Sequence, residues 1–223
     1  MNWFGLFAAL GGVSAILWLR SNHRKIGLSE NEFWAVMWLM VAGGVIGAKL
    51  LFVILGWHHY TSGELSFWGD FGTGYVFFGG LIGAMLVAIL FARVRGLGFW
   101  RGADYFAVAL PLAHGIGRVG CFFTGCCPGK PPHPVQIYEA LGLAAISLGC
   151  WFLLRRVENG NWVRGSVFCI YGVSYGVLRF LLDPLRADGR PERFLGISHQ
   201  QGIALSLVLV SLVAWWWLKR STS

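Results

Sequence analysis

The chain has 223 residues, of which 56% are hydrophobic and 13% are charged, and its mean hydropathy is +0.61. So few charged side chains cannot cover a soluble globule of this length, which excludes a soluble protein and indicates a membrane protein. The formal net charge of +8 therefore reflects how cations are divided between the two sides of a bilayer, and we expect no nucleic-acid partner.

Seven apolar stretches follow one another, and the segments between them are too short for a separate soluble domain. We predict an all-α polytopic membrane protein in which residues 1–223 form a single transmembrane domain. Most stretches are close to the length of about 17 to 25 residues that a span requires. The fourth is short and contains Pro111, so we expect its far end to be irregular and to line a cavity. The predicted spans are residues 3–19, 33–55, 75–91, 103–117, 136–154, 165–182 and 202–218.

Lysine and arginine are unequally divided between the two sides of the predicted bundle, with 11 on one side and five on the other. The larger group contains Arg20, Arg24, Lys25, Arg93, Arg95, Arg101, Arg155, Arg156, Arg164, Lys219 and Arg220. The smaller group contains Arg118, Lys130, Arg186, Arg190 and Arg193. The positive-inside rule places the larger group in the cytoplasm, so we predict that the N-terminus is outside and the C-terminus cytoplasmic.

Two cations, Lys49 and Arg179, fall inside predicted spans rather than in loops. A cation within the membrane costs at least about 2.5 kcal/mol on insertion scales, so it is usually paired or faces water. We expect both residues to be functional; the alternative is that each extends its charge toward the headgroups. Glu139, near the start of the fifth span, raises the same question for a carboxylate.

Residues 112–139 gather polar and reactive side chains at the outer end of the fourth span. The segment HGIGRVGCFFTGCCPG begins at His114, and His114 and Arg118 would share one face if the helix continued that far. Its glycines would let backbone N–H groups approach an anion. This concentration indicates a functional site rather than packing.

A second polar set closes the sixth span, in the segment YGVLRFLLDPLR. Tyr175, Arg179, Asp183 and Arg186 are spaced so that they lie along one helical stripe. Arg179 and Asp183 could form a simple ion pair, but Arg186 then leaves surplus positive charge near the headgroups. We expect Arg118 and Arg179 to hold the phosphate of a phospholipid together, because a guanidinium binds phosphate bidentately.

These segments resemble the motifs of the bacterial prolipoprotein diacylglyceryl transferase family. HGIGRVGCFFTGCCPG is similar to the family's GRIGNFxNGExxG signature, and HPVQIYEAL is similar to its HPSQLYEAL. FFGGLIGA resembles the family's FHGGLIG, and IGAKL resembles its GARL. YGVLRFLLDPLR and GISHQQ resemble its YGxxRFxxExxR and ISMGQ. The motifs follow in family order and extend over most of the chain, including the family's seven-helix arrangement with the N-terminus outside.

The resemblance implies transfer of a diacylglyceryl group from phosphatidylglycerol, or a related anionic phospholipid, to a cysteine thiol of a prolipoprotein or to another acceptor at the outer leaflet. It also implies a multi-pass protein of the bacterial cytoplasmic (inner) membrane, with its site facing the periplasm or exterior, and neither a metal nor a soluble cofactor. The expected catalytic residues are Arg118, Arg179, Tyr175, His133 and His114. The expected lipid-binding residues are Arg118, Arg179, Arg186, Asp183, Gln136, Tyr138, Glu139, Gly79, Gly80 and Lys49.

The sequence departs from the family pattern at three polar positions. Phe78 replaces the histidine of the family's HGG, Cys121 replaces an asparagine of the signature, and Cys126 replaces its glutamate. A phenyl ring cannot carry a proton, so a transferase would need His114 or His133 as its base. The alternative is a non-catalytic phospholipid-binding or membrane assembly protein that kept the arginines and lost the base.

Cys121, Cys126 and Cys127 lie on the predicted outer side, which in bacteria is oxidising. One expectation is a disulfide between Cys121 and one of the other two. A second is a thiolate beside Arg118 that acts as a nucleophile or lipid carrier. The spacing of the three cysteines and the nearby histidines does not match a usual zinc site, so we expect no metal.

Overall fold

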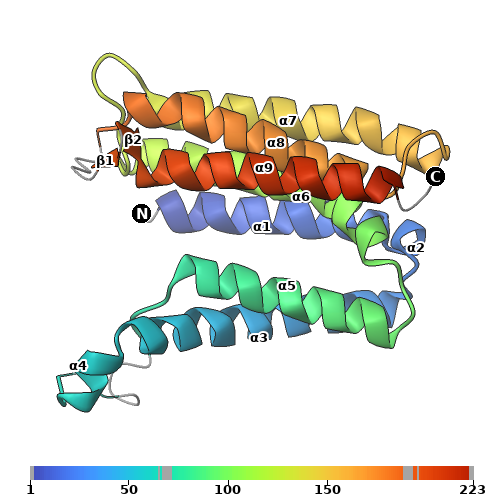
Figure 1. Ribbon diagram of the computed structural model, residues 1–223, viewed down its shortest axis with the longest axis horizontal. Coiled ribbons are helices and arrows are strands. Elements are labelled where there is room, and N and C mark those ends of the chain that lie inside the picture. The colour runs from blue at the N-terminus through green and yellow to red at the C-terminus, as the bar shows by residue number, and fades with distance from the viewer. Residues whose placement is uncertain (1–2, 65, 67–71, 188–192, 195, 221–223) are drawn as a thin grey trace. The chain divides into compact units, whose positions relative to one another are not determined.

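The computed structural model describes residues 3–64, 66, 72–187, 193–194 and 196–220. Within these ranges, seven helices are long and apolar enough to cross a membrane, which confirms the all-α, seven-span prediction (Figure 1). The long helices are α1 (Trp3–Ser21), α3 (Glu30–Leu55), α5 (Phe77–Val94), α6 (Phe99–Phe123), α7 (Val135–Glu158), α8 (Ser166–Leu182) and α9 (His199–Arg220). The short elements are α2 (His23–Ile26), α4 (Trp57–Thr61), the 3-10 helix η1 (Asp183–Leu185), β1 (Arg193–Phe194) and β2 (Ile197–Ser198).

The chain divides into two compact units. One consists of Met1–Asn22 and Trp100–Ser223, and the other of His23–Phe99. The first unit therefore contains α1 and α6 to α9, and the second contains α2 to α5. A single transmembrane domain and the sidedness of the termini stay predictions.

In the second unit, α3 and α5 pack against each other through glycines. A methyl group on Gly79 would collide with the carbonyl oxygen of Gly47, and one on Gly83 would collide with that of Gly43. Gly80 similarly faces Gly44. Small residues let two membrane helices approach until their backbones touch. This close packing stabilises the pair through van der Waals contacts, because no hydrophobic effect drives helices together within lipid. Gly79 and Gly80 therefore pack helices, and lipid binding by them stays a prediction.

Lys49 is the buried cation of this unit, with 5% of its surface exposed. Its Nζ donates to the carbonyl oxygen of Thr73 at 3.0 Å and lies 5.4 and 5.6 Å from the ring centroids of Phe52 and Tyr75. A carbonyl dipole and two aromatic faces offset part of the cost of a charge within a span. The cation thereby ties α3 to the segment that precedes α5, and lipid binding by Lys49 stays a prediction.

In the first unit, α6 is continuous from Phe99 to Phe123, so the prediction of a short fourth span with an irregular far end was wrong. Pro111 is buried inside this helix, where it removes one backbone donor. Ser147 of α7 donates its hydroxyl to the carbonyl oxygen of Val108 at 2.9 Å, close to that position. Neighbouring helices of this kind pack around proline within a span, although the carbonyl that Pro111 leaves without its helical donor is that of Ala107. His114 and Arg118 consequently lie on a regular helix.

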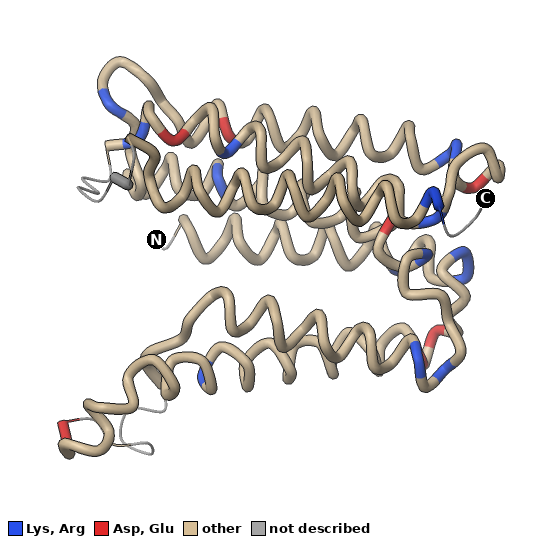
Figure 2. The backbone as a smooth tube through the Cα atoms, in the orientation of Figure 1, with Lys and Arg blue, Asp and Glu red and all other residues tan. Residues whose placement is uncertain are grey.

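Three cations at one end of the first unit cover aromatic rings of their own helices. The distances to the ring centroids are 4.1 Å for Arg155 over Trp151, 4.3 Å for Lys219 over Trp215 and 4.0 Å for Arg220 over Trp216. Figure 2 shows cations gathered where α7 and α9 end, opposite the α6–α7 loop. Aromatic and basic side chains together are typical of the membrane–water interface, so we expect this end of the unit to lie at that interface.

Candidate functional site

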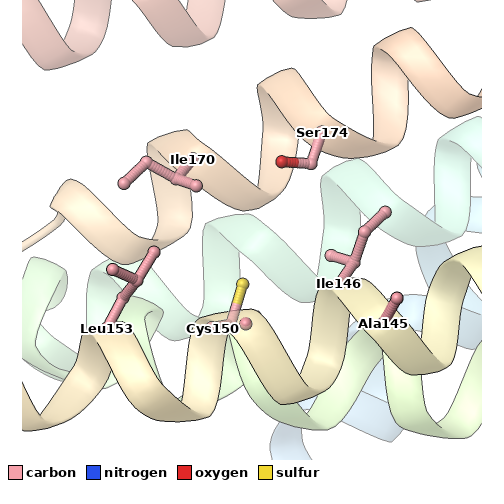
Figure 3. Close-up of a pocket in the computed structure, with 7 residues that line it drawn as sticks. Ala145, Ile146, Cys150, Leu153, Ile170 and Ser174 are labelled. Atoms are coloured by element: carbon pink, nitrogen blue, oxygen red, sulfur yellow. The ribbon is translucent and has the colours of Figure 1, made fainter.

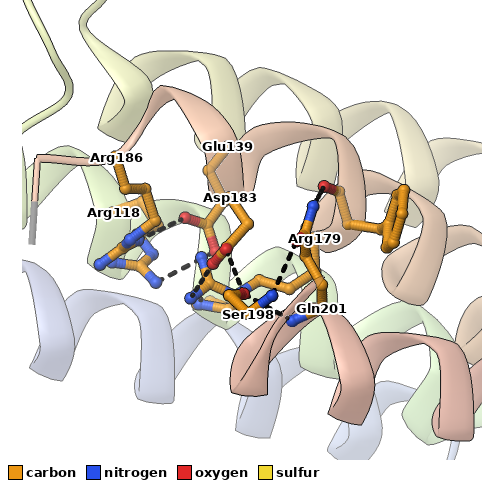
Figure 4. Close-up of polar contacts among 9 residues, drawn as sticks. Arg118, Glu139, Arg179, Asp183, Arg186, Ser198 and Gln201 are labelled. Carbon is orange, nitrogen blue, oxygen red and sulfur yellow. Dashed lines mark hydrogen bonds and ion pairs between the residues drawn. The ribbon is translucent and has the colours of Figure 1, made fainter. Parts of the chain in front are cut away.

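A buried carboxylate, Glu139, lies at the centre of the candidate site, with 1% of its side chain exposed. Its Oε1 is 3.0 Å from Arg118 Nη2 and 3.7 Å from His114 Nε2. Its Oε2 is 3.6 Å from Arg186 Nη1, so one carboxylate joins cations from α6 and from the segment after α8 (Figure 4). The structure therefore brings four of the predicted site residues together.

Local helix geometry accounts for this meeting. His114 and Arg118 are four residues apart on α6 and so project from the same face. Glu139 lies in the second turn of α7, and Arg186 directly follows η1, which ends α8. Burying charges is costly unless they are closely paired, so each of these side chains depends on the others for its place in the interior.

Arg179 and Asp183 form the second part of the site. Arg179 Nη2 is 3.7 Å from Asp183 Oδ1, so the simple i, i+4 pair is present. Ser198 donates its hydroxyl to Asp183 Oδ2 at 2.5 Å, which ties the start of α9 to the end of α8 (Figure 4). Ser198 and Gln201 also exchange backbone-to-side-chain hydrogen bonds, both at 3.0 Å, as a capping box. Neither was predicted as a site residue, although S-x-x-Q before an apolar run is a sequence signal for such a cap.

Two buried arginine donors at this site have no hydrogen-bond partner within the part of the chain that the structure describes. They are Arg118 Nε and Arg179 Nη1. The oxygens of Glu139 lie at ion-pair distances from Arg118 and Arg186, and neither oxygen has a hydrogen-bond partner among the described residues. Among the residues that the structure describes, Glu139 and Asp183 are the carboxylates at ion-pair distance from Arg118, Arg179 and Arg186. Buried donors are normally satisfied, so this arrangement suits an anion with several acceptor oxygens.

Tyr175 and His114 complete the cluster. Their ring centroids are 5.6 Å apart, and both rings are close enough to Arg118, Arg179 and Glu139 to feel their charges. The polar stripe predicted on α8 therefore does face the side of α6 that carries His114 and Arg118. His133 instead lies beside Tyr138, with 6.2 Å between the ring centroids.

The α6–α7 loop rests on the segment that carries Arg186. Gly129 and Arg186 form an antiparallel β-bridge, and Lys130 Nζ donates to the carbonyl oxygen of Pro184 at 2.9 Å. At the other end of the loop, Gln136 Nε2 donates to the carbonyl oxygen of Cys126 at 3.0 Å. Gln136, expected to bind lipid, thus has a clear role in positioning the loop.

The loop also contains two of the three clustered cysteines. Cys126 is exposed, and its Sγ is 3.2 Å from Cys127 Sγ, while Cys121 is buried in the last turn of α6. Hydrogen bonding to Cys127, with smaller contributions from burial and from Cys121, raises the pKa of Cys126 from 9.0 to about 12. A thiol with such a pKa is protonated at neutral pH, so Cys126 is a poor nucleophile there, and a thiolate nucleophile elsewhere in the cluster stays a prediction. Among the described residues, no group of three or more His, Cys, Asp and Glu side chains is arranged to hold a metal ion.

A second feature of this unit is an apolar groove between α7 and α8, with a volume of about 310 Å³ (Figure 3). Its lining consists of Ala145, Ile146, Gly149, Cys150, Leu153, Ile170 and Ser174. None of these residues belongs to the charged cluster, and none is ionised, so the groove is separate from the polar chemistry.

Asp104 is a buried carboxylate of α6 that was not predicted to matter. It accepts hydrogen bonds from the backbone N–H groups of Gly165 at 2.6 Å and Phe168 at 3.0 Å. A side chain of α6 therefore caps the N-terminus of α8, where free N–H groups and the helix dipole favour a negative charge. The available sequence signal was an acid at the start of an apolar span.

Comparison with known proteins agrees with the motif resemblance. The family model described as prolipoprotein diacylglyceryl transferase matches residues 1–217. A phosphatidylglycerol–prolipoprotein diacylglyceryl transferase of Clostridium tetani is 27% identical over 94% of this chain and 90% of its own length. A protein of the same name from Geobacillus kaustophilus is 29% identical over 96% of this chain and 86% of its own length.

Proposed function

Because the chain belongs to the prolipoprotein diacylglyceryl transferase family, we propose that it moves a diacylglyceryl group from an anionic phospholipid to an acceptor thiol. The donor is phosphatidylglycerol or a close relative, and the acceptor is a cysteine of a prolipoprotein. The reaction takes place at the outer leaflet of the bacterial cytoplasmic membrane, where the predicted topology places the charged cluster.

The observation that carries this proposal is the set of arginines around Glu139. Arg118 and Arg186 are held by the carboxylate, and Arg118 Nε remains as an unpaired buried donor. Arg179 adds a second such donor, Nη1. A phosphodiester has the charge and the oxygens to accept from both, and guanidinium groups bind such oxygens strongly where water is scarce.

The reaction requires a leaving group and a proton acceptor. The acceptor sulfur forms a bond to the glycerol carbon of the lipid as the bond from that carbon to the phosphate oxygen breaks. Glycerol phosphate departs with the electron pair, and the thiol proton passes to a base. The arginines stabilise the charge on the departing phosphate, and fixed donors of this kind commonly supply the largest part of catalysis.

His114 is the best placed base. Its Nε2 lies 3.7 Å from Glu139 Oε1, and 34% of its side chain is exposed, so an acceptor can reach it. The carboxylate stabilises the imidazolium that forms when the proton is taken up. Phe78, in the position of the family's histidine, has no atom that can do this.

Turnover measured in arginine variants tests the proposal. In phosphatidylglycerol vesicles with a cysteine-containing acceptor peptide, Arg118→Ala and Arg179→Ala should each lower release of glycerol phosphate by about 100-fold or more. Arg155→Ala is the matched control, because this guanidinium covers Trp151 at the other end of the unit, and it should leave turnover unchanged. Equal turnover in all three variants would contradict the proposal.

The second candidate is a non-catalytic phospholipid-binding or assembly protein, and Phe78 is the observation that favours it. Such a protein would bind phosphatidylglycerol through the same arginines but release no glycerol phosphate. Complementation of a bacterium depleted of its own diacylglyceryl transferase separates the two candidates. Growth supports the transferase, whereas failure to grow together with Arg118-dependent lipid binding supports the second candidate.

A further inference from the structure

The C-terminus of α6 ends in a well-defined cap. The N–H of Cys126 donates to the carbonyl oxygen of Cys121 at 3.1 Å, and the N–H of Gly125 donates to that of Phe122 at 3.2 Å. Gly125 has a φ of +67°, in the left-handed region that glycine adopts without strain. These two bonds and this glycine define a Schellman motif, in which Cys121 and Cys126 occupy the positions on either side of the turn.

In a Schellman motif the side chains at those two positions lie on the same side of the turn and are frequently in contact, usually as apolar groups. Here both side chains are thiols. Cys121 is buried, while Cys126 is exposed and accessible to a reagent. A third thiol, Cys127 Sγ, lies 3.2 Å from Cys126 Sγ. Three thiols on one short turn are far more than packing of a helix end requires.

We propose that Cys121 and Cys126 form a disulfide across the C-terminal turn of α6, with Cys127 remaining a free thiol. The backbone hydrogen bond between the two residues already holds them side by side, as a disulfide needs. A bond between Cys126 and Cys127 would instead have to close a ring through a single peptide unit, which the preferred disulfide geometry opposes.

The oxidation is balanced by a disulfide-containing oxidant. The thiols of Cys121 and Cys126 lose two protons and two electrons as the S–S bond forms, and the oxidant is reduced to two thiols by exchange through a mixed disulfide. Exposed Cys126 is the thiol that such an oxidant reaches first. Oxidants of this class act on the outer side of the bacterial cytoplasmic membrane, where the loop is predicted to lie.

The disulfide would join the end of α6 to the loop that supports the site. The carbonyl oxygen of Cys126 accepts from Gln136, and the loop then pairs with Arg186 at Gly129. Oxidation would therefore restrain the segment beside the guanidinium that holds Glu139. An effect of this restraint on transfer rests on the proposed function, whereas formation of the disulfide does not.

The test uses the purified full chain in detergent, oxidised glutathione as the oxidant, and alkylation of the remaining thiols after denaturation. The reduced chain should take up label at all five cysteines, and the oxidised chain at two fewer. Cys127→Ser should still lose two labelled positions on oxidation. Cys121→Ser and Cys126→Ser should lose none.

Peptide mapping of the unreduced wild-type chain gives a second measurement that does not depend on whether a variant folds. A peptide that is about 2 Da lighter than its reduced form and labelled at Cys127 supports the proposal, because two hydrogens are lost. Full labelling of all cysteines after oxidation, or protection of Cys127, overturns it. Since both readouts are masses, a chain that forms the disulfide and transfers no lipid would refute only the proposed function.

Discussion

Arg118 Nη2 lies 3.0 Å from Glu139 Oε1, and this carboxylate is almost completely buried. The pair links α6 to α7, and the second oxygen of Glu139 extends the link to Arg186. A buried ion pair contributes little net stability relative to an apolar pair, because both charges must leave water. Removing only one partner is strongly destabilising, because the charge of the other partner then stays buried without compensation.

Glu139→Gln should therefore reduce both stability and turnover. The amide keeps the shape of the side chain but removes the negative charge that Arg118 and Arg186 both face, which should cost about 3 to 5 kcal/mol of unfolding free energy. Chemical denaturation in detergent measures this loss. The double variant Arg118→Gln, Glu139→Gln should be less destabilised than the sum of the two single variants, by about 0.5 to 3 kcal/mol. Strict additivity would show that the two side chains do not interact.

His114→Gln should lower the rate of transfer by about 100-fold or more, because glutamine keeps some hydrogen bonding but cannot take up a proton. His133→Gln is the control, since His133 lies beside Tyr138 in the loop, and its rate should change only slightly. Steady-state rates with the acceptor peptide make the comparison. A larger effect at His133 than at His114 would remove His114 as the base.

Replacing Gly83 by alanine should destabilise the α3–α5 pair, because the added methyl group collides with the backbone carbonyl of Gly43. Overpacking of this kind costs about 1 to 3 kcal/mol. Gly12→Ala is the matched control: Gly12 is also in a membrane helix, but nothing lies within 4 Å of a methyl group there. Thermal unfolding of both variants decides the matter, and a Gly83→Ala variant as stable as Gly12→Ala would contradict the packing.

Cysteines introduced one at a time at Ser62 and Asn159 test the predicted topology. Both positions are exposed, and the prediction places them on opposite sides of the membrane. The native thiols Cys126 and Cys127 are first replaced by serine so that they do not react. In sealed cells, a reagent that cannot cross the membrane should label position 62 and spare position 159. Labelling of position 159 from outside would invert the topology and place the charged cluster in the cytoplasm.

The rate of Cys126 alkylation should keep rising at pH values at which an ordinary thiol is already ionised and its rate no longer increases. Its pKa is raised to about 12, chiefly by the hydrogen bond with Cys127, so the reactive thiolate should increase about tenfold per pH unit between pH 7 and 10. In a Cys127→Ala variant the pKa should fall and the rate at pH 8 should rise, although Cys121 still faces the thiol. Rates are read from the labelled peptide, and a plateau near pH 9 in the wild type would contradict the shift.

The number and order of the helices could be predicted because apolar stretches of spanning length are visible in the sequence itself. The polar stripe on α8 was also predictable, because Tyr175, Arg179 and Asp183 repeat with helical spacing in an otherwise apolar segment. The continuity of α6 was not predictable from Pro111 alone. Whether a proline breaks a span depends on the neighbouring helices, and periodicity carries no information about neighbours such as Ser147.

Which side chains pair with one another within the site could not be predicted from the sequence either. The stripe on α8 predicted that Arg179 points inward, but not that Glu139 would take Arg118 and Arg186 as its cations. Ser198 was overlooked for a related reason. Its cap on α9 is local, whereas its bond to Asp183 depends on how two segments 15 residues apart return to each other.

The cap that Asp104 provides for α8 has a mechanical consequence. From Asp104 to Arg118 on α6, and from Gly165 to Arg179 on α8, the chain rises by the same number of residues, which is about 21 Å in each helix. The hydrogen bond between Asp104 and Gly165 therefore fixes the heights of Arg118 and Arg179 relative to each other. With a lever of that length, a tilt of α8 by about 3° moves Arg179 by about 1 Å. Misplacement on that scale can reduce a rate by about 100-fold, so Asp104 sets the alignment of a site that it never touches.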